Sequence, residues 1–507
     1  MLQTTAEQKK IIHTDLLPGE TLKIMAFAGT GKTTTLVEYT KKRSNMRFLY
    51  IAFNKSVQLE AARKFPGNVT TRTTHSLAFR AKGFKYKDRL VKGFRANQVM
   101  TALKLEKYED ARYTMDTLAN YLASADPKVS HHHIPPMARG FYQKNKTALP
   151  PLVDHANTLG RLMCDGTNQA IGMLHDGYLK LYQLSAPILP YDCILLDEAQ
   201  DINPVTAAIV FAQAQNCQTQ DINQDKNKDQ DQERTRKLAS IILVGDGHQQ
   251  IYSFRGARDT LKTFSAGKTH YLTQSFRFDN NVARVANMIL KIFKREPRQI
   301  AGTPVPTKPP WDPGHHTIIA RTNATLFDRA VRLYKQHKIG FVGGVGSYRL
   351  TILKDVYYLY KQDHSRINDA YIKGFKSFMD LKSYARTVED FELSSVCKMV
   401  EKYTTTIPSH VDRIMAQAVE GENAAILLTT AHKSKGLEWA NVLLMEDFHP
   451  LMKEGKIIDP SGVDPDEFNL IYVAMTRAMV NLRFDRESDI PAFIRLCLKR
   501  AGGPGPG

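Results

Sequence analysis

The element that most restricts the fold of this chain lies near its start. A short, mostly apolar run, Leu22–Phe27, leads into Ala28-Gly29-Thr30-Gly31-Lys32-Thr33 and then into the helical pattern TTTLVEYTKKR. A strand, a glycine-rich loop and a helix in this order form a phosphate cradle. The glycines let backbone N–H groups point at the phosphates, and the helix N-terminus adds the positive end of its dipole. This order predicts a P-loop NTPase domain of the doubly wound α/β class.

Two side chains of this loop have predicted chemical roles. Lys32 supplies a cation to the β and γ phosphates of ATP, and Thr33 offers a hydroxyl ligand to Mg²⁺. Ala26 stands where the consensus has its first glycine, a position that tolerates a small residue. The predicted ATP contacts in the loop are Ala28, Gly29, Thr30, Gly31, Lys32 and Thr33.

The acidic half of the predicted site ends the string CILLDEAQD. Asp197 is expected to hold Mg²⁺, directly or through water, and Glu198 to orient and deprotonate the attacking water. Phosphoryl transfer also needs cations at the γ-phosphate, and Arg277 in LTQSFRF and Arg477 in YVAMTRA are the candidates. The long sequence gap between the two arginines suits a cleft between two domains, with one arginine from each face.

A second group of residues favours single-stranded nucleic acid as a partner. Phe53 in LYIAFNK, His75 in TRTTHSLAF, and Tyr252 with Phe254 in QQIYSFRGA place aromatic rings inside motif strings. Stacking on such rings tolerates any base and contributes about 1–3 kcal/mol per base. Gln249 shortly precedes Phe254, so one rigid segment would touch both the γ-phosphate and the strand. Polar neighbours that could meet phosphates are Asn54, Thr74, Ser76, Arg255 and Lys435.

Composition agrees with a polyanionic partner. The net charge is +19 at pH 7 and the pI is about 9.5, and basic groups near phosphates release condensed counterions. The 5 cysteines are scattered without a CxxC pair, which argues against a zinc ribbon, an iron–sulfur cluster or disulfides. The chain has no apolar run of roughly 20 residues and no signal-peptide core at its start. We therefore expect an intracellular protein without a membrane partner, in the cytoplasm or nucleoid of a prokaryote or the nucleus of a eukaryote.

The motif strings together resemble the UvrD/Rep-like branch of superfamily 1 helicases, and within it the F-box DNA helicase family. The narrowing strings are HDGYLKLYQLSAP, GDGHQQIYSFRGA and ARTNATLFDRAVRL, and the likeness runs from about Gln8 to about Arg477. The resemblance implies two RecA-like parallel-sheet motor domains with helical insertions. It also implies an ATP-dependent 3′-to-5′ helicase or translocase of DNA repair or recombination. Its partners would be single-stranded and tailed duplex DNA and, in some members, recombinase filaments.

By this resemblance, Gln8 reads adenine, Phe276 stacks on it and Glu438 contacts the ribose. Thr34 takes the place of an arginine that packs on adenine in bacterial relatives. The implied γ-phosphate sensors are Gln249, Arg277 and Arg477. The implied DNA track consists of Phe53, Thr74, His75, Tyr252, Phe254, Arg255, His432 and Lys435. No F-box precedes the motor motifs, so a ubiquitin-ligase partnership is not expected.

Pattern and resemblance together predict a division into domains. Residues 1–79 and 187–278 would form motor domain 1A, and residues 279–360 and 424–500 motor domain 2A. Residues 80–186 would be a helical 1B insertion and residues 361–423 a small 2B-like insertion. We expect a disordered loop at residues 215–236, a flexible tail at residues 501–507, and a monomeric or weakly self-associating protein.

One further cluster and four alternatives complete the predictions. His131, His132 and His133 precede a Pro-Pro pair without a nearby carboxylate or cysteine, which favours a loop over a metal site. An RNA-directed motor and a non-unwinding, ATP-gated strand clamp stay open. A helicase–nuclease is disfavoured because about 30 residues follow Arg477. A P-loop ATPase without a nucleic-acid partner is disfavoured by the later motifs and the charge.

Overall fold

The computed structural model describes residues 4–215, 238–252, 259–304, 309–387 and 390–500. The chain forms two compact units, Met1–Ala26 with Gly31–Leu272, and Phe27–Thr30 with Thr273–Gly507. Three predictions fall outside the described residues: the contacts of Phe254 and Arg255, the loop 215–236 beyond Gln215, and the tail 501–507. None of the described helices combines the length and apolar character that crossing a bilayer requires.

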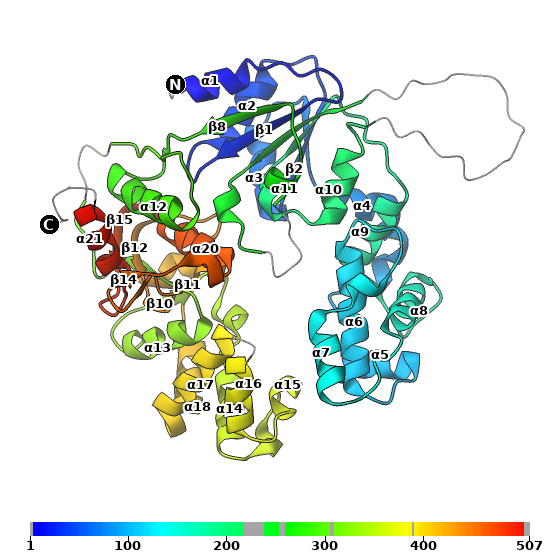
Figure 1. The fold of residues 1–507 in the computed structure, drawn as a ribbon, viewed down its shortest axis with the longest axis vertical. Helices are drawn as coiled ribbons and strands as arrows, with labels where there is room; N and C mark the ends of the chain where they lie inside the picture. Colours follow the sequence, from blue (N-terminus) through cyan, green and yellow to red (C-terminus); the bar gives the residue numbers. More distant parts are fainter. Residues whose placement is uncertain (1–3, 216–237, 253–258, 305–308, 388–389, 501–507) are drawn as a thin grey trace, which may run out of the picture. The chain divides into compact units, whose positions relative to one another are not determined.

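A six-stranded parallel sheet organises the first unit (Figure 1). Its order is β3-β2-β6-β7-β1-β8. The strands are β1 (Thr21–Ala26), β2 (Phe48–Ala52), β3 (Val69–Thr73), β6 (Cys193–Leu196), β7 (Ser240–Gly245) and β8 (Lys268–Leu272). β2, β6 and β7 are buried along their whole length, as expected of central strands that are covered on both faces. Because all six run parallel, their carboxyl ends meet at one edge of the sheet.

Side chains of β2 alternate between two hydrophobic cores, one on each face of the sheet. Phe48, Tyr50 and Ala52 join the core beneath α1 (Ala6–Ile12), α2 (Lys32–Lys41) and α3 (Lys55–Lys64). Leu49 and Ile51 join the core beneath α10 (Pro204–Phe211) and α11 (Thr260–Thr263). The sheet is therefore sandwiched between helices, as in doubly wound folds.

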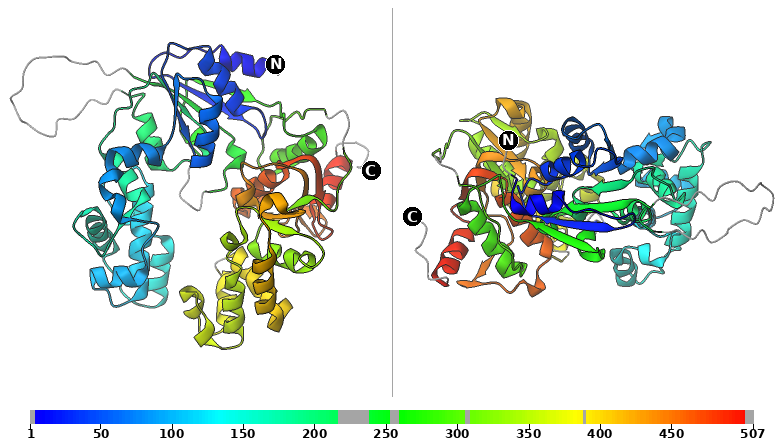
Figure 2. Two further views of the ribbon diagram at one scale, coloured as in Figure 1. Left: turned by 180° about the vertical axis from the view of Figure 1, so that it is seen from behind. Right: turned by 90° about the horizontal axis from the view of Figure 1, so that it is seen from above.

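The segment between β3 and β6 is largely helical. It contains α4 (Thr74–Ala78), α5 (Ala96–Leu103), α6 (Tyr108–Ala123), α7 (Pro136–Lys144), α8 (Leu152–Cys164), α9 (His175–Leu184), and the short strands β4 (Leu90–Val91) and β5 (Met173–Leu174). α5, α6, α8 and α9 extend the second core through Val99, Leu118, Leu159 and Leu179. Figure 2 shows these cyan and teal helices gathered as one group in both views.

The second unit is built on a five-stranded parallel sheet with the order β10-β11-β9-β12-β15. The strands are β9 (His316–Ala320), β10 (Ile339–Phe341), β11 (Ile426–Thr430), β12 (Trp439–Leu444) and β15 (Ala478–Phe484), and β13 (Met452–Lys453) and β14 (Lys456–Ile457) form a hairpin. Its helices are α12 (Asn280–Phe293), α13 (Asn323–Leu333), α14 (Thr351–Tyr360), α15 (Ala370–Lys373), α16 (Phe378–Thr387), α17 (Phe391–Tyr403), α18 (Ile407–Gln417), α19 (Ala431–Ser434), α20 (Pro465–Met475) and α21 (Ile490–Arg500). Two parallel sheets with flanking helices confirm the predicted α/β class with two RecA-like domains.

The division between the units falls at Leu272, whereas the sequence placed the end of the first motor domain at Phe278. Backbone hydrogen bonds give the reason. Ala301 N–H donates to Thr273 O at 3.0 Å, and Thr303 N–H donates to Phe278 O at 2.9 Å. The segment that contains Phe276 and Arg277 is therefore joined to the second unit by backbone hydrogen bonds.

The expectation for His131–His133 is corrected in two respects. These residues form a short 3-10 helix, and Asp126 lies beside them, with its Oδ2 2.7 Å from His132 Nε2 and 3.0 Å from His133 Nε2. The chain reverses between Asp126 and Ser130, which spacing in the sequence did not reveal. Ser130 N–H donates to His133 Nδ1 at 3.0 Å, so in neutral His133 the proton is on Nε2 and faces Asp126. The cluster braces this turn through hydrogen bonds to Asp126 and Ser130.

Candidate nucleotide and strand site

The phosphate loop has the backbone geometry that its glycines allow. Gly29 has φ +74° and Gly31 has φ +75°, in the left-handed region that side chains rarely adopt. A Cβ at Gly29 would also lie 2.5 Å from Arg277 Cβ, which belongs to the same compact unit. Lys32 and Thr33 open the ten-residue helix α2, so both stand where N–H groups face away from the helix and suit phosphate.

Lys32 is held by the predicted catalytic carboxylate. Its Nζ lies 2.8 Å from Glu198 Oε1. Burial alone would lower the pKa of Lys32, but the carboxylates of Glu198, Asp197 and Asp246 outweigh it and raise this pKa. The lysine therefore stays a cation, which is the form that binds phosphate.

Asp197 and Glu198 follow the end of β6, as the sequence predicted. Asp197 is only 5% exposed, and burial together with the Glu198 carboxylate raises its pKa, against the opposing effects of Lys32 and Tyr50. Tyr50 of β2 donates its hydroxyl hydrogen to Asp197 Oδ2, and Glu198 N–H donates to Asp197 Oδ1 at 2.9 Å. Glu198 itself has φ 49°, a left-handed conformation that is strained for a residue other than glycine.

A buried amide joins the carboxylates to the next strand. Gln200 donates through Nε2 to Glu198 Oε2 at 2.6 Å, and its Oε1 accepts from Asp246 N–H at 3.1 Å, just after β7. Gln249 in turn donates to Asp246 Oδ2 at 2.8 Å. The predicted base and the predicted γ-phosphate sensor thus belong to one hydrogen-bonded chain, Glu198–Gln200–Asp246–Gln249. A Cβ at Gly245 would lie 2.1 Å from Gln200 Oε1, so any other residue there would displace the Gln200 amide.

Four predicted strand contacts of the first unit line a cavity of about 310 Å³: Phe53, Thr74, His75 and Tyr252. Phe53, which is 46% exposed, stacks on Tyr252 with ring centroids 6.0 Å apart and planes 15° apart. His75 Nε2 lies 3.0 Å from Asp176 Oδ1 of α9. The lining of the cavity includes Phe53, Thr74, His75, Tyr252, Asp176 and Asp197. The rings predicted to stack on bases and the carboxylate predicted to hold Mg²⁺ therefore share one cavity within one unit.

Asn54 has a structural task in addition to its predicted one. Its Oδ1 accepts from Val57 N–H at 2.9 Å and caps α3. Gln8 likewise forms the capping box of α1, because its Oε1 accepts from Thr5 N–H at 3.0 Å. Thr34 is exposed on the first turn of α2.

Both predicted arginine sensors lie in the second compact unit. Arg277 donates through Nε to Glu438 Oε2 at 2.6 Å and through Nη1 to Thr476 O at 3.3 Å. Arg477 is 1% exposed and donates to Val473 O at 2.9 Å and to Leu437 O at 3.2 Å. The reason is the early division at Leu272, which places Arg277 with the motifs of α20.

The remaining predicted residues of the second unit lie on its loops and on the short helix α19. Phe276 is 41% exposed, and its N–H donates to Gly29 O at 2.8 Å. Ala28 N–H donates to Tyr472 Oη at 3.1 Å. His432 lies in α19 and Lys435 directly after it, beyond the end of β11.

Two family models match the chain: an AAA domain over residues 8–255 and a UvrD-like helicase C-terminal domain over residues 355–485. The chain is 36% identical over 513 residues to F-box DNA helicase 1 of Gallus gallus, across 94% of this chain and 48% of that protein. The chain belongs to the UvrD-like superfamily 1 helicases.

Two further relatives of the chain are also named DNA helicases. The chain is 30% identical over 531 residues to F-box DNA helicase protein 1 of Schizosaccharomyces pombe, across 94% of this chain and 57% of that protein. It is 28% identical over 163 residues to DNA helicase IV of Escherichia coli, across 31% of this chain and 20% of that protein. The chain spans about half the length of the two F-box helicases it matches.

The first unit brings together Gly31, the Lys32 cation and the carboxylates of Asp197 and Glu198. Sequence reasoning missed Tyr50, Gln200 and Asp176. A hydroxyl in the otherwise apolar run FLYIA was a usable signal for Tyr50. Gln200 and Asp176 lie inside quoted motif strings, but their partners come from other strands and helices. The individual roles of the site residues remain predictions.

Proposed function

We propose that this chain couples ATP hydrolysis to 3′-to-5′ movement along single-stranded DNA and that it separates tailed duplexes. The observation that carries the proposal is the 310 Å³ cavity in which Phe53, His75 and Tyr252 face the same space as Asp197. A strand stacked on these rings would lie beside the carboxylate of the nucleotide site. Binding of one ligand can then bias the grip on the other.

Hydrolysis would begin with a change of partner at Lys32. Its ammonium group is paired with Glu198. The β and γ phosphates of ATP would draw Lys32 away and leave Glu198 to accept a proton from water. The water oxygen forms the new bond to the γ-phosphorus while the bond to the bridging oxygen of ADP breaks. Gln200 would hold the carboxylate in place throughout this step.

Thr33 and Asp197 are the residues that would hold Mg²⁺. The donors suit it, because Mg²⁺ prefers oxygen ligands and Asp197 is anchored through single hydrogen bonds to each oxygen. When bound, Mg²⁺ neutralises charge that develops on the phosphates. The chain itself positions Asp197 through Tyr50 of β2, and β2 ends next to Phe53. One strand thus reaches from the metal ligand to the base-stacking wall.

In the second unit, Arg277 and Arg477 would stabilise the γ-phosphate charge, and Glu438 would exchange Arg277 for the ribose of ATP. Thr476 supports this joint role, because its carbonyl accepts from Arg277 and its hydroxyl accepts from Arg477 at 3.2 Å. DNA is favoured over RNA because the curated relatives are named DNA helicases. Displacement of recombinase filaments and a role in repair or recombination belong to the same proposal.

The deciding experiment compares ATP hydrolysis by purified protein without nucleic acid and with single-stranded DNA, duplex DNA or single-stranded RNA. We expect strong stimulation by single-stranded DNA alone, followed by unwinding of duplexes that carry a 3′ tail and not a 5′ tail. Equal stimulation by RNA would overturn the substrate class. Strand binding without stimulated hydrolysis would make the chain an ATP-gated clamp instead.

A further inference from the structure

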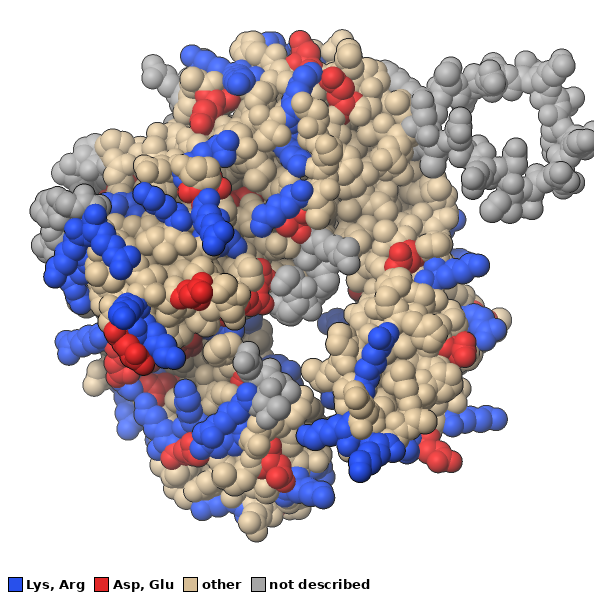
Figure 3. Space-filling model, viewed as in Figure 1, with Lys and Arg blue, Asp and Glu red and all other residues tan. Residues whose placement is uncertain are grey.

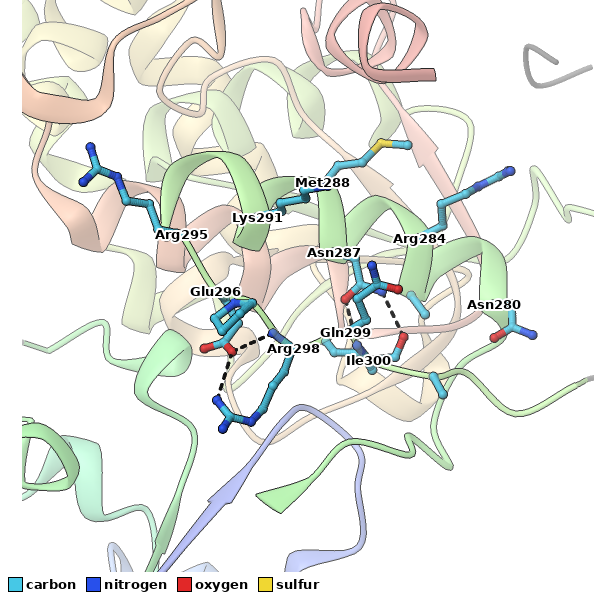
Figure 4. Close-up of a pocket in the computed structure, with 13 residues that line it drawn as sticks. Asn280, Arg284, Asn287, Met288, Lys291, Arg295, Glu296, Arg298, Gln299 and Ile300 are labelled. Carbon is cyan, nitrogen blue, oxygen red and sulfur yellow. Dashed lines mark hydrogen bonds and ion pairs between the residues drawn. The ribbon is translucent and has the colours of Figure 1, made fainter. Parts of the chain in front are cut away.

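A basic groove runs along α12 in the second unit and is not used by the nucleotide site or the strand cavity. It encloses about 720 Å³ between α12 and the extended segment that follows it (Figure 4). Four cations line it: Arg284, Lys291, Arg295 and Arg298. Glu296 is the single carboxylate of the lining. It is already hydrogen-bonded to Arg298, whose backbone N–H donates to it at 3.0 Å.

Side-chain amides of α12 fix the position of the extended segment that forms the other wall of the groove. Asn287 donates through Nδ2 to Ile300 O at 2.9 Å and accepts from Ile300 N–H at 2.8 Å. Asn280 Oδ1 accepts from Gly302 N–H at 2.9 Å. These bonds hold the extended segment antiparallel to α12 at a fixed separation, as the dashed lines in Figure 4 show for Asn287.

Two of the cations have no ion-pair partner within the part of the chain that the structure describes. These are Arg284 and Lys291, and both are exposed. Arg295 is also exposed, and hydrogen bonds from Ser461 together with the charge of Arg295 lower the pKa of the Asp459 carboxylate. Arg284 and Lys291 lie two turns apart on one face of α12, about 10 Å along the helix axis. That distance spans about three phosphates on one strand of B-DNA.

The basic surface continues onto α21, which packs on α12 through Phe493 and Phe293, with ring centroids 5.5 Å apart. α21 carries Arg495, Lys499 and Arg500 on its exposed side and no acidic residue. Figure 3 shows Lys and Arg side chains gathered over α12 and α21. A surface of this kind attracts a polyanion through counterion release.

We propose that this groove binds the phosphodiester backbone of duplex DNA, as a second nucleic-acid site beside the predicted single-strand track. The inference rests on the proposed function for its choice of DNA. The lining decides between duplex and single strand, because it contains arginine, lysine, asparagine and glutamine but no aromatic ring. Single strands are held by stacking on aromatic rings, whereas duplexes keep their bases stacked internally and are held by their phosphates.

The test compares the pair Arg284→Ala/Lys291→Ala with the matched pair Arg413→Ala/Lys398→Ala. The control residues are likewise exposed, on α18 and α17 of the same unit. Affinity for a blunt duplex is measured without nucleotide over a series of salt concentrations. Each lost phosphate contact lowers the slope of log K against log salt by about 0.9. We expect the groove pair to lower this slope by about 2 and the affinity by roughly tenfold, and the control pair to change neither.

Unchanged slopes in the groove pair, or equal losses in both pairs, would overturn the proposal. An acidic protein partner would give the first of these results. Single-strand-stimulated hydrolysis by the same variants is the separate readout of the proposed function, and we expect it to stay within about twofold of the unaltered protein. If the unaltered protein shows no stimulated hydrolysis, the proposed function fails, while the duplex-binding slopes still decide the role of the groove.

Discussion

Lys32 and Glu198 neutralise each other across 2.8 Å, although the proposed reaction needs each of them for a different task. Both are largely buried, so neither charge can be left without a partner at low cost. Each group of the pair therefore compensates the charge of the other. In the proposed reaction, the ATP phosphates replace Glu198 as the partner of Lys32, and the freed carboxylate becomes available as a base.

Lys32→Ala is expected to lower ATP hydrolysis at least about 100-fold, because the phosphates lose their cation and Glu198 loses the partner that holds it. Strand affinity should change less than about threefold, since Lys32 does not line the cavity of Phe53 and His75. Phosphate release and fluorescence anisotropy with labelled single-stranded DNA measure the two effects. Equal loss of both, with a lower Tm, would assign Lys32 a folding role instead.

Tyr50→Phe tests the support of Asp197. The Tyr50 hydroxyl stabilises the ionised carboxylate, so its removal should raise the pKa of Asp197 further above its usual range. The acid limb of the pH profile for kcat should then move to higher pH, and more Mg²⁺ should be needed for half-maximal hydrolysis. Tyr348→Phe is the control. It also removes a buried, hydrogen-bonded tyrosine hydroxyl, but this hydroxyl donates to a backbone carbonyl in the second unit. A stability loss of about 1 kcal/mol in both variants, with identical pH profiles, would refute the role of Tyr50.

At the level of elements, the carboxyl ends of β1, β2, β6 and β7 carry the whole first half of the site. This much follows from the sequence, because apolar runs that end in GTGK, FN, DEAQD and GDGHQQ predict parallel strands with functional residues at one edge. The pairing of Gln200 with both Glu198 and Asp246 did not follow, because it depends on the register of β6 against β7. The position of Asp126 beside His133 was not predicted either, because the spacing of residues in the sequence does not reveal where the chain reverses.

Gly245→Ala is expected to act through Gln200. The added Cβ would lie 2.1 Å from Gln200 Oε1 and displace the amide, which breaks the chain from Glu198 to Asp246. Strand-stimulated hydrolysis should fall roughly 10- to 100-fold, as for a base held slightly out of place, and Gln200→Ala should give the same kinetics. Gly67→Ala is the matched control, because nothing lies within 4 Å of its Cβ position. A normal rate in Gly245→Ala would contradict the positioning role of Gln200.

Over the whole molecule, strand binding and ATP binding must be linked reciprocally if the proposed motor is correct. A strand that strengthens the grip on ATP is itself held more tightly with ATP, by the same factor. The first unit offers a physical route for this linkage, since β2 carries Tyr50 at Asp197 and ends beside the ring of Phe53. The net charge of +19 makes both affinities sensitive to salt, so they must be compared at one ionic strength.

Phe53→Ala should raise the concentration of single-stranded DNA needed for half-maximal stimulation by roughly tenfold, because one stacking platform is lost. Hydrolysis without DNA should be unchanged. Phe84→Ala is the control, since Phe84 is a phenylalanine of the same unit that is 62% exposed and lies outside the lining of the cavity. Titration of hydrolysis with oligonucleotide measures both variants, and equal shifts would indicate that Phe53 is no more than a surface residue.

The left-handed backbone of Glu198 places conformational strain at the proposed catalytic base. Holding a glutamate at φ 49° costs the fold about 1–2 kcal/mol that glycine would not cost. Glycine at this position would relieve the strain, but it would also remove the carboxylate that compensates the buried Lys32 charge and accepts from Gln200. The melting temperature of a Glu198→Gly variant would therefore report the balance between relief of backbone strain and an unpaired buried cation.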